Sequence, residues 1–264
     1  AILADTSNVF YGEIARKLEE IAFQHGYTVL FGSDDESPEK HDRIMRSFID
    51  KGVDGFIIVP CEGSDKSIRF IQNLGIPFVI IDRKDMAVEA PKIVLDNKGA
   101  MKSAVDILIP KGFRKIEMLS YTMRVSSISD REDGFIEAME GLGCSKDDIN
   151  IHRLPFNDID GATAKLMPGI IERGVEGLVF ATNSLAIAAI KTLFSMGVKL
   201  QEDIYLVGFD NSDVYDLFDP PIPHVRQPIS TICNEALEIL FGLMDHGLKQ
   251  TSSLIVLSGE VVNN

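Results

Sequence analysis

Short apolar runs alternate with longer amphipathic segments from one end of this chain to the other. The first part contains apolar runs of strand length at residues 2–5, 27–31, 56–59, 78–81 and 93–95. Segments with apolar residues at helical spacing lie between them, at residues 9–25, 39–51 and 65–74. Strands that alternate with helices in this way predict parallel β-α-β units.

A second series of the same kind follows. Its strands are predicted at residues 116–120, 152–156, 178–181 and 204–210. Its helices are predicted at residues 100–109, 130–141, 160–173 and 185–196, the last with Ser184 as its N-cap. A long amphipathic helix at 230–246 and a strand at 254–257 complete the chain. The sequence therefore predicts an α/β protein with two sheets.

Polar side chains stand at the ends of three predicted strands. Asp82 follows the apolar run at 78–81, and Asn183 and Asp210 end two consecutive strands of the second series. In open parallel α/β sheets, ligands bind at the carboxyl edge of the strands. We therefore expect these three residues to mark a ligand-binding edge.

Several short motifs stand out in the chain: Asn183, Gly208-Phe209-Asp210, Pro220-Pro221, Gln227-Pro228 and, earlier, Arg131-Glu132-Asp133-Gly134-Phe135. Together they resemble motifs of the LacI/GalR family of bacterial transcriptional regulators. Two positions depart from the family pattern, since Ser184 replaces the usual Asp and Ile222-Pro223-His224 replaces Leu-Thr-Thr. The resemblance covers essentially the whole chain and points to the effector-binding core of such a regulator.

This resemblance implies a periplasmic-binding-protein-like fold: two similar Rossmann-like lobes, each with a parallel sheet, joined by a three-strand hinge. The N-terminal lobe is expected to comprise residues 1–97 and 227–250, and the C-terminal lobe residues 98–226 and 251–264. The chain would cross between the lobes near residues 96–99, 222–228 and 247–252. A hinge of this kind permits closure on a ligand.

The resemblance also implies effector contacts from the first lobe. The family pattern Asn-Pro-Phe-Phe appears here as Asn8-Val9-Phe10-Tyr11, so Phe10 and Tyr11 offer a flat aromatic face and a hydroxyl. The alternative is that they form a packing pair at the start of a helix. Asp82 can accept two hydroxyl hydrogen bonds from a sugar, or it can pair with Arg83 instead.

In the second lobe, the resemblance places the central effector contact at Arg131. Its planar guanidinium suits a carboxylate, a phosphate or two vicinal hydroxyls. A surface arginine beside Asp130 or Glu132 is the alternative. Ser127, just upstream, is expected to supply a further hydroxyl.

Three more residues complete the predicted effector site. Phe180 is expected to form an aromatic wall, although burial in the sheet is the more common fate of such a residue. Asn183 can donate to and accept from the same hydroxyl. Asp210 is expected to pair with Arg131, with the ligand or with both; its alternative is to cap the loop that follows its strand.

Composition narrows the functional classes. The chain has 40 acidic and 26 basic residues and a net charge of −14, so these residues are expected to repel a phosphate backbone. Its three cysteines are far apart and form no CxxC pair, so the sequence predicts neither a disulfide nor a zinc site. No apolar run reaches the about 18 residues that a membrane span needs.

No catalytic constellation is found in the sequence. GxGxxG after the first strand, GxxxxGK[ST], GxSxG and HExxH are all missing, and the five histidines lack metal-ligand spacing. We therefore expect no enzymatic activity, no cofactor and no metal. No signal peptide is visible, but Ala1 is not an initiator methionine, so this says little about the true N-terminus.

The resemblance implies a ligand-sensing and dimerisation domain of a LacI-type regulator. A small effector, sugar-like first and a nucleobase second, would bind in the inter-lobe cleft and change operator affinity allosterically. A cytoplasmic homodimer would bind operator DNA through a helix-turn-helix that this chain does not contain. The alternative is a periplasmic sugar-binding protein of a transport system, against which the Pro-Pro and Gln-Pro crossover argues.

Overall fold

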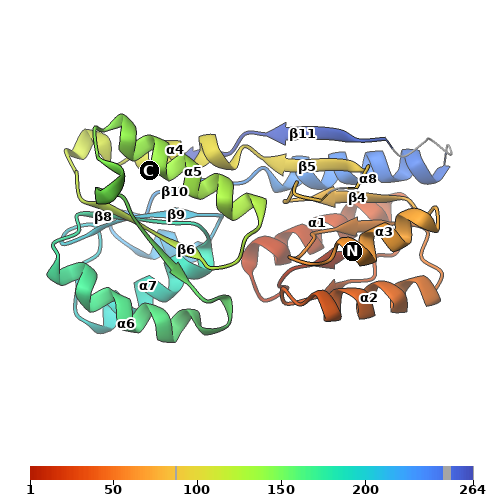
Figure 1. Cartoon of the computed structure of the whole chain (residues 1–264), viewed down its shortest axis with the longest axis horizontal. Helices are drawn as coiled ribbons and strands as arrows, with labels where there is room; N and C mark the ends of the chain where they lie inside the picture. The colour runs from red at the N-terminus through yellow and green to blue at the C-terminus, as the bar shows by residue number, and fades with distance from the viewer. Residues whose placement is uncertain (87, 246–250, 264) are drawn as a thin grey trace. The chain divides into compact units, whose positions relative to one another are not determined.

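The computed structural model describes residues 1–86, 88–245 and 251–263 (Figure 1). The chain divides into two compact units. The first spans residues 1–95, 125–127 and 228–257, and the second spans residues 96–124, 128–227 and 258–264. Each unit is built around a mostly parallel sheet, so the predicted α/β class with two sheets is confirmed.

The first unit contains a parallel sheet with the strand order β11-β5-β4-β3-β1-β2. Its strands are β1 (Ile2–Leu3), β2 (Gly32–Ser33), β3 (Phe56–Ile58), β4 (Phe78–Ile81), β5 (Pro91–Leu95) and β11 (Ser253–Leu257). Its helices are α1 (Val9–Gln24), α2 (Pro38–Asp50), α3 (Asp65–Asn73) and α8 (Ile229–Asp245). In Figure 1 the blue α8 and β11 accompany the red-to-yellow elements of this unit.

The strands of this sheet are apolar on both faces because helices cover both faces. Successive residues of a strand point to opposite sides. One set, which includes Ile57 and Val79, packs against α1 and α8. The other set, which includes Ile58 and Ile80, packs against α2 and α3. These two layers fix the carboxyl ends of the strands, where the polar residues follow.

The second unit has the strand order β12-β10-β9-β8-β6-β7. Its strands are β6 (Ile116–Tyr121), β7 (Asn150–Leu154), β8 (Gly177–Phe180), β9 (Tyr205–Phe209), β10 (His224–Arg226) and β12 (Glu260–Val262). Its helices are α4 (Asn97–Asp106), α5 (Ser126–Gly141), α6 (Ile159–Glu172) and α7 (Asn183–Ser195). Neighbouring strands are parallel except β10 and β12, which are antiparallel. None of the described helices has the length and apolar character to cross a membrane.

Three strands differ from the sequence prediction. The strand predicted at 27–31 appears as β2 at Gly32–Ser33, because its neighbour β1 comprises only Ile2 and Leu3 and pairs with those two residues. The short strands β10 and β12 were not predicted. They pair with each other beside β9, and β10 lies inside the segment that had been interpreted as a proline-rich crossover.

The last predicted strand belongs to the other sheet. The sequence assigned residues 251–264 to the C-terminal lobe, whereas β11 pairs with β5 of the first unit from Ser253 and Pro91 to Leu257 and Leu95. Ile255 and Leu257 pack against the core of that unit, which explains the assignment. The chain therefore crosses after residue 257 instead of at 247–252. Residues 246–250, which include the predicted end of the long helix, lie outside the described part.

Candidate functional site

In the first unit, Tyr11 and Asp82 form a buried polar pair. The side chain of Asn8 accepts a hydrogen bond from the Phe10 backbone N at 2.9 Å and thereby caps α1. Tyr11 therefore lies in the first turn of the helix, where its hydroxyl donates to Asp82 Oδ2 at 3.1 Å. Tyr11 and Asp82 are each 8% exposed. Burial, and then the Asp82 carboxylate, raise the pKa of Tyr11 well above its usual value, so the phenol keeps its proton.

Asp82 also contacts Arg83, the alternative partner that the sequence offered. Arg83 Nε lies 3.4 Å from Asp82 Oδ2 but makes no hydrogen bond there. The guanidinium instead donates to Glu36, at 2.9 and 2.5 Å, and to the Pro60 carbonyl at 2.7 Å. Asp82 is thus held between a neutral hydroxyl donor and an arginine whose hydrogen bonds go elsewhere.

Phe10 and Ser127 are less clearly part of this polar group. Phe10 meets the Tyr11 ring edge to face, with the centroids 5.0 Å apart, and is buried in the core of the first unit. This agrees with the packing alternative for Phe10. Ser127 is buried, and its segment 125–127 groups with the first unit, whereas the sequence placed it in the second lobe. The neighbouring Ser126 hydroxyl accepts from the Lys84 backbone N at 2.8 Å, which ties this segment to the loop after β4.

In the second unit, Arg131 is a buried cation with only 3% exposure. Its Nε donates to Asn97 Oδ1 at 2.7 Å and its Nη1 to the Ala181 carbonyl at 2.6 Å. Its guanidinium carbon lies 3.9 Å from the centroid of the Phe209 ring. The surface-arginine alternative is therefore wrong. Glu132, the neighbour considered as its partner, is paired with Arg153.

A glycine in the same motif allows Arg131 to reach Asn97. A Cβ on Gly134 would lie 2.4 Å from the Lys98 carbonyl oxygen, so only glycine lets α5 pack this closely on the first turn of α4. Asn97 is the residue just before Lys98. The spacing between Arg131 and Gly134 thus places one turn of α5 against the residue that holds the guanidinium.

Asp210 and Asn183 form the second pair of this unit. The Asn183 backbone N donates to Asp210 Oδ2 at 3.4 Å, and Gln227 Nε2 donates to Asp210 Oδ1 at 2.6 Å. Asn183 is the first residue of α7, and the N-cap is Thr182, whose hydroxyl accepts from the Leu185 N. The prediction of Ser184 as N-cap was wrong, because the helix begins before it. Asn183 and Asp210 are both buried.

Phe180 is 1% exposed within β8, so it lies in the interior of the second unit. The aromatic ring that covers the Arg131 guanidinium belongs to Phe209 instead. Phe209 belongs to the Gly-Phe-Asp motif, Gln227 to the Gln-Pro motif and Asn97 to a predicted crossing segment. None of the three was predicted as a site residue. Their proximity depends on the folded chain, and only their neighbourhood to matched motifs could have indicated them.

The two strand-end aspartates share a backbone conformation. Asp82 has φ +69° and Asp210 has φ +64°, both in the left-handed region that L-residues rarely adopt. Asp82 follows β4 and accepts a hydrogen bond from the Tyr11 hydroxyl. Asp210 follows β9 and accepts from the Asn183 backbone N and from the Gln227 side chain. Strained residues of this kind cluster at ligand sites.

The chain is similar to known proteins over most of its length. The chain matches the family described as "Periplasmic binding protein-like domain" over residues 105–263. It is 29% identical to the HTH-type transcriptional regulator DegA of Bacillus subtilis over 266 residues, which cover 99% of this chain and 78% of that protein. It is also 29% identical to the ribose operon repressor of Halalkalibacterium halodurans, over 86% of this chain and 67% of that protein.

Solved structures share the fold. A LacI family transcriptional regulator from Enterococcus faecium with bound ribose superposes with a TM-score of 0.86. The superposition covers 99% of this chain and 95% of that structure. At 19% sequence identity, this likeness shows the fold alone.

Proposed function

This chain belongs to the periplasmic binding protein-like domain family, and from that premise we propose that it is the effector-binding part of a LacI-type transcriptional regulator that binds a sugar or sugar derivative. The resemblance to LacI-type regulators that the sequence predicted is confirmed. Its relatives are regulators of transcription, and the transport alternative is not favoured.

The observation that carries the effector proposal is the buried guanidinium of Arg131. A buried cation is unfavourable unless it is paired or well hydrogen-bonded. The acceptors at Nε and Nη1 are both neutral oxygens, from an amide and a carbonyl. A ligand with vicinal hydroxyls or an anionic group would add acceptors to this cation, and a planar guanidinium suits both.

The polar groups of the first unit complement this chemistry. Tyr11 donates to Asp82, and the carboxylate keeps lone pairs that can accept from the hydroxyls of a sugar. A sugar is therefore the first ligand class that we propose, with ribose as the first member to test, since a ribose-bound neighbour and a ribose operon repressor are among the similar proteins. A nucleobase is the second class.

The regulatory part of the proposal follows from the relatives. The effector would change operator affinity through its different affinities for two conformations of the protein. With a net charge of −14, this chain is a poor surface for DNA, so a helix-turn-helix outside it would contact the operator. Under this proposal the protein acts as a homodimer in the cytoplasm and has no catalytic activity. Phe10, Ser127 and Phe180 would support the residues that contact the effector.

Thermal unfolding with a ligand panel tests the effector proposal. Ribose, other mono- and disaccharides, sugar acids, sugar phosphates and purines are added to the wild type and to Arg131→Ala. A ligand at about 100 times its dissociation constant should stabilise the wild type by about 2.7 kcal/mol, which raises the midpoint by a few degrees. We expect Arg131→Ala to lose this shift.

Arg153→Ala is the matched control. Arg153 belongs to the same unit, and its half-exposed side chain pairs with Glu132 instead of with a predicted site residue. It should retain the full shift. An equal shift in Arg131→Ala would place the effector elsewhere, and a panel that never moves the wild-type midpoint would contradict the sugar proposal.

A further inference from the structure

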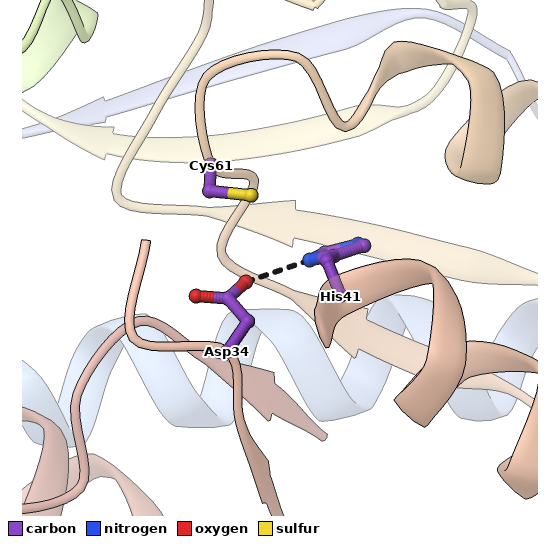
Figure 2. Close-up of side chains that lie close together, drawn as sticks. All are labelled: Asp34, His41 and Cys61. Atoms are coloured by element: carbon purple, nitrogen blue, oxygen red, sulfur yellow. Dashed lines mark hydrogen bonds and ion pairs between the residues drawn. The ribbon is translucent and has the colours of Figure 1, made fainter. Parts of the chain in front are cut away.

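Three buried side chains with metal-ligand atoms meet in the first unit, in a cluster that the effector proposal does not use. Asp34 follows β2, His41 lies in the first turns of α2, and Cys61 follows β3. Asp34 and His41 are 0% exposed and Cys61 is 2% exposed. Figure 2 shows the Cys61 sulfur and the Asp34 carboxylate directed toward the His41 ring.

The distances allow the three side chains to share one ion. One ligand atom from each residue lies within 4.8 Å of the others. Asp34 Oδ2 lies 2.7 Å from His41 Nδ1, while Asp34 Oδ1 accepts from the Glu36 backbone N at 3.0 Å. Ligand atoms around a four-coordinate Zn²⁺ lie roughly 3.5 Å apart, as follows from bonds of about 2.0–2.3 Å. The cluster therefore needs only small side-chain adjustments.

The nitrogen of His41 that faces the other two residues is Nδ1, whose hydrogen bond to Asp34 Oδ2 an ion between the three side chains would replace. The other ring nitrogen, Nε2, is buried and has no hydrogen-bond partner among the described residues. The imidazole is therefore hydrogen-bonded through one nitrogen only.

We propose that Asp34, His41 and Cys61 bind a thiophilic divalent ion such as Zn²⁺. A thiolate, an imidazole nitrogen and a carboxylate are the donors that proteins use for Zn²⁺, and a thiolate does not suit Ca²⁺ or Mg²⁺. On binding, the Cys61 thiol releases its proton to solvent, the His41 imidazole holds its proton on Nε2, and the thiolate and Nδ1 form bonds to the ion. The two positive charges are then matched by one carboxylate and one thiolate, which suits a fully buried position.

The ion would join three segments that are separate in sequence. Asp34, His41 and Cys61 come from the loop after β2, from α2 and from the loop after β3, and the spacings of 7 and 20 residues match no metal motif. Glu36 and Pro60, which accept the hydrogen bonds of Arg83, lie within two residues of Asp34 and Cys61. A bound ion would thus steady the groups that hold Arg83 next to Asp82.

Cobalt substitution tests the site directly. Chelator-treated wild type is titrated with Co²⁺, and the absorption spectrum is followed for the thiolate-to-cobalt charge-transfer band. We expect one equivalent of Co²⁺ to produce the band and one equivalent of Zn²⁺ to abolish it. Cys61→Ser should lose the band, and His41→Gln should weaken Co²⁺ binding at least tenfold.

The other two cysteines provide matched controls. Cys233 is also a buried thiol of the first unit, in the core with α8, and Cys144 is the half-buried cysteine of the second unit. Cys233→Ser and Cys144→Ser should retain the band. The proposal is overturned if the wild type gives no band, or if the band persists in Cys61→Ser. If Cys61→Ser does not fold, as circular dichroism would show, the wild-type band and His41→Gln decide the matter.

Discussion

Asp82 adopts a backbone conformation that is unfavourable for a residue with a side chain and that a hydrogen bond must offset. A left-handed φ is unfavourable by roughly 1 kcal/mol for a residue with a Cβ, and asparagine and aspartate tolerate it best. Asp82 has φ +69° directly after β4, and its carboxylate turns to the Tyr11 hydroxyl. The conformation therefore places the carboxylate, and the hydrogen bond offsets part of the strain.

Two substitutions of Asp82 separate the effect of the carboxylate from that of the backbone strain. Alanine and glycine both remove the carboxylate, but only glycine removes the strain of the left-handed backbone. Asp82→Gly should therefore be more stable than Asp82→Ala by roughly 1 kcal/mol in urea unfolding. At Glu19, an exposed residue of α1, the order should reverse, because glycine is unfavourable in a helix. If alanine were more stable than glycine at position 82 as well as at position 19, the backbone of Asp82 would carry no strain.

Tyr11 predicts a specific pH dependence of stability. Its pKa lies well above 10.0 in the folded protein, chiefly because of burial. A raised pKa stabilises the fold fully below the unfolded value of about 10, and that contribution is lost as the pH rises above it. Tyr11→Phe removes both the hydrogen bond and this titration, so the wild type should be more stable by about 1 kcal/mol below pH 10.

Above pH 10 the advantage of the wild type should shrink, by at most about 1.4 kcal/mol for each pH unit. Urea unfolding of both proteins at a series of pH values from neutral to alkaline measures this difference. Parallel stability curves across pH 10 would mean that Tyr11 ionises in the folded protein as easily as in the unfolded chain.

The site residues could be predicted from the sequence only where a topological rule applied. Asp82, Asn183 and Asp210 were expected at strand ends, and the structure pairs Asn183 with Asp210. The partners Asn97 and Gln227 were not predicted, because they come from segments 34 residues before Arg131 and 17 residues after Asp210 that only the fold brings close. Side-chain burial, as for Phe180, likewise depends on packing that the strand pattern does not specify.

The packing of β9 depends on Gly208, which has no side chain. A Cβ on Gly208 would lie 2.5 Å from the Tyr215 ring, and Tyr215 is fully buried with its hydroxyl donating to the Phe209 carbonyl at 3.1 Å. A shift of this ring would have to displace the residues that bury it. The glycine of the Gly-Phe-Asp motif thus lets Tyr215 support the strand end that presents Asp210.

Gly208→Ala should therefore destabilise the protein by roughly 1–3 kcal/mol, the range for overpacking in a tight core. Urea unfolding measures this loss. Gly12→Ala is the control, because Gly12 lies in α1 with nothing within 4 Å of an added Cβ. That substitution should leave stability unchanged or raise it by up to about 1 kcal/mol. A Gly208→Ala protein as stable as Gly12→Ala would mean that Tyr215 can yield.

Most helices and strands could be predicted because each has a strong apolar pattern and clear ends. The exceptions have physical reasons. β10 and β12 contain three residues each, and an antiparallel pair of that length leaves almost no pattern. The location of β11 could not follow from its sequence, because an edge strand with alternating exposed Leu254 and Val256 fits the edge of either sheet. Only the pairing with β5 decides it.

Each unit has its own sheet and its own buried residues, and the chain passes between the units after residues 95, 124, 127, 227 and 257. The proposed effector contacts are divided in the same way, with Tyr11 and Asp82 in the first unit and Arg131, Asn183 and Asp210 in the second. Because the two sets lie in different units, the effect of a bound ligand on each set can be measured separately.

Hydrogen–deuterium exchange with a ligand from the panel tests this. A ligand that contacts both sets must slow amide exchange in the loop after β4 and also at the start of α7 and the end of β9, because binding stabilises only the states in which these contacts exist. Arg131→Ala should remove the protection in both units together, since the loss of one contact set lowers the affinity for the whole ligand. Protection that remains in one unit, in the wild type or in the variant, would mean that the effector binds that unit alone and that the other set has a structural role.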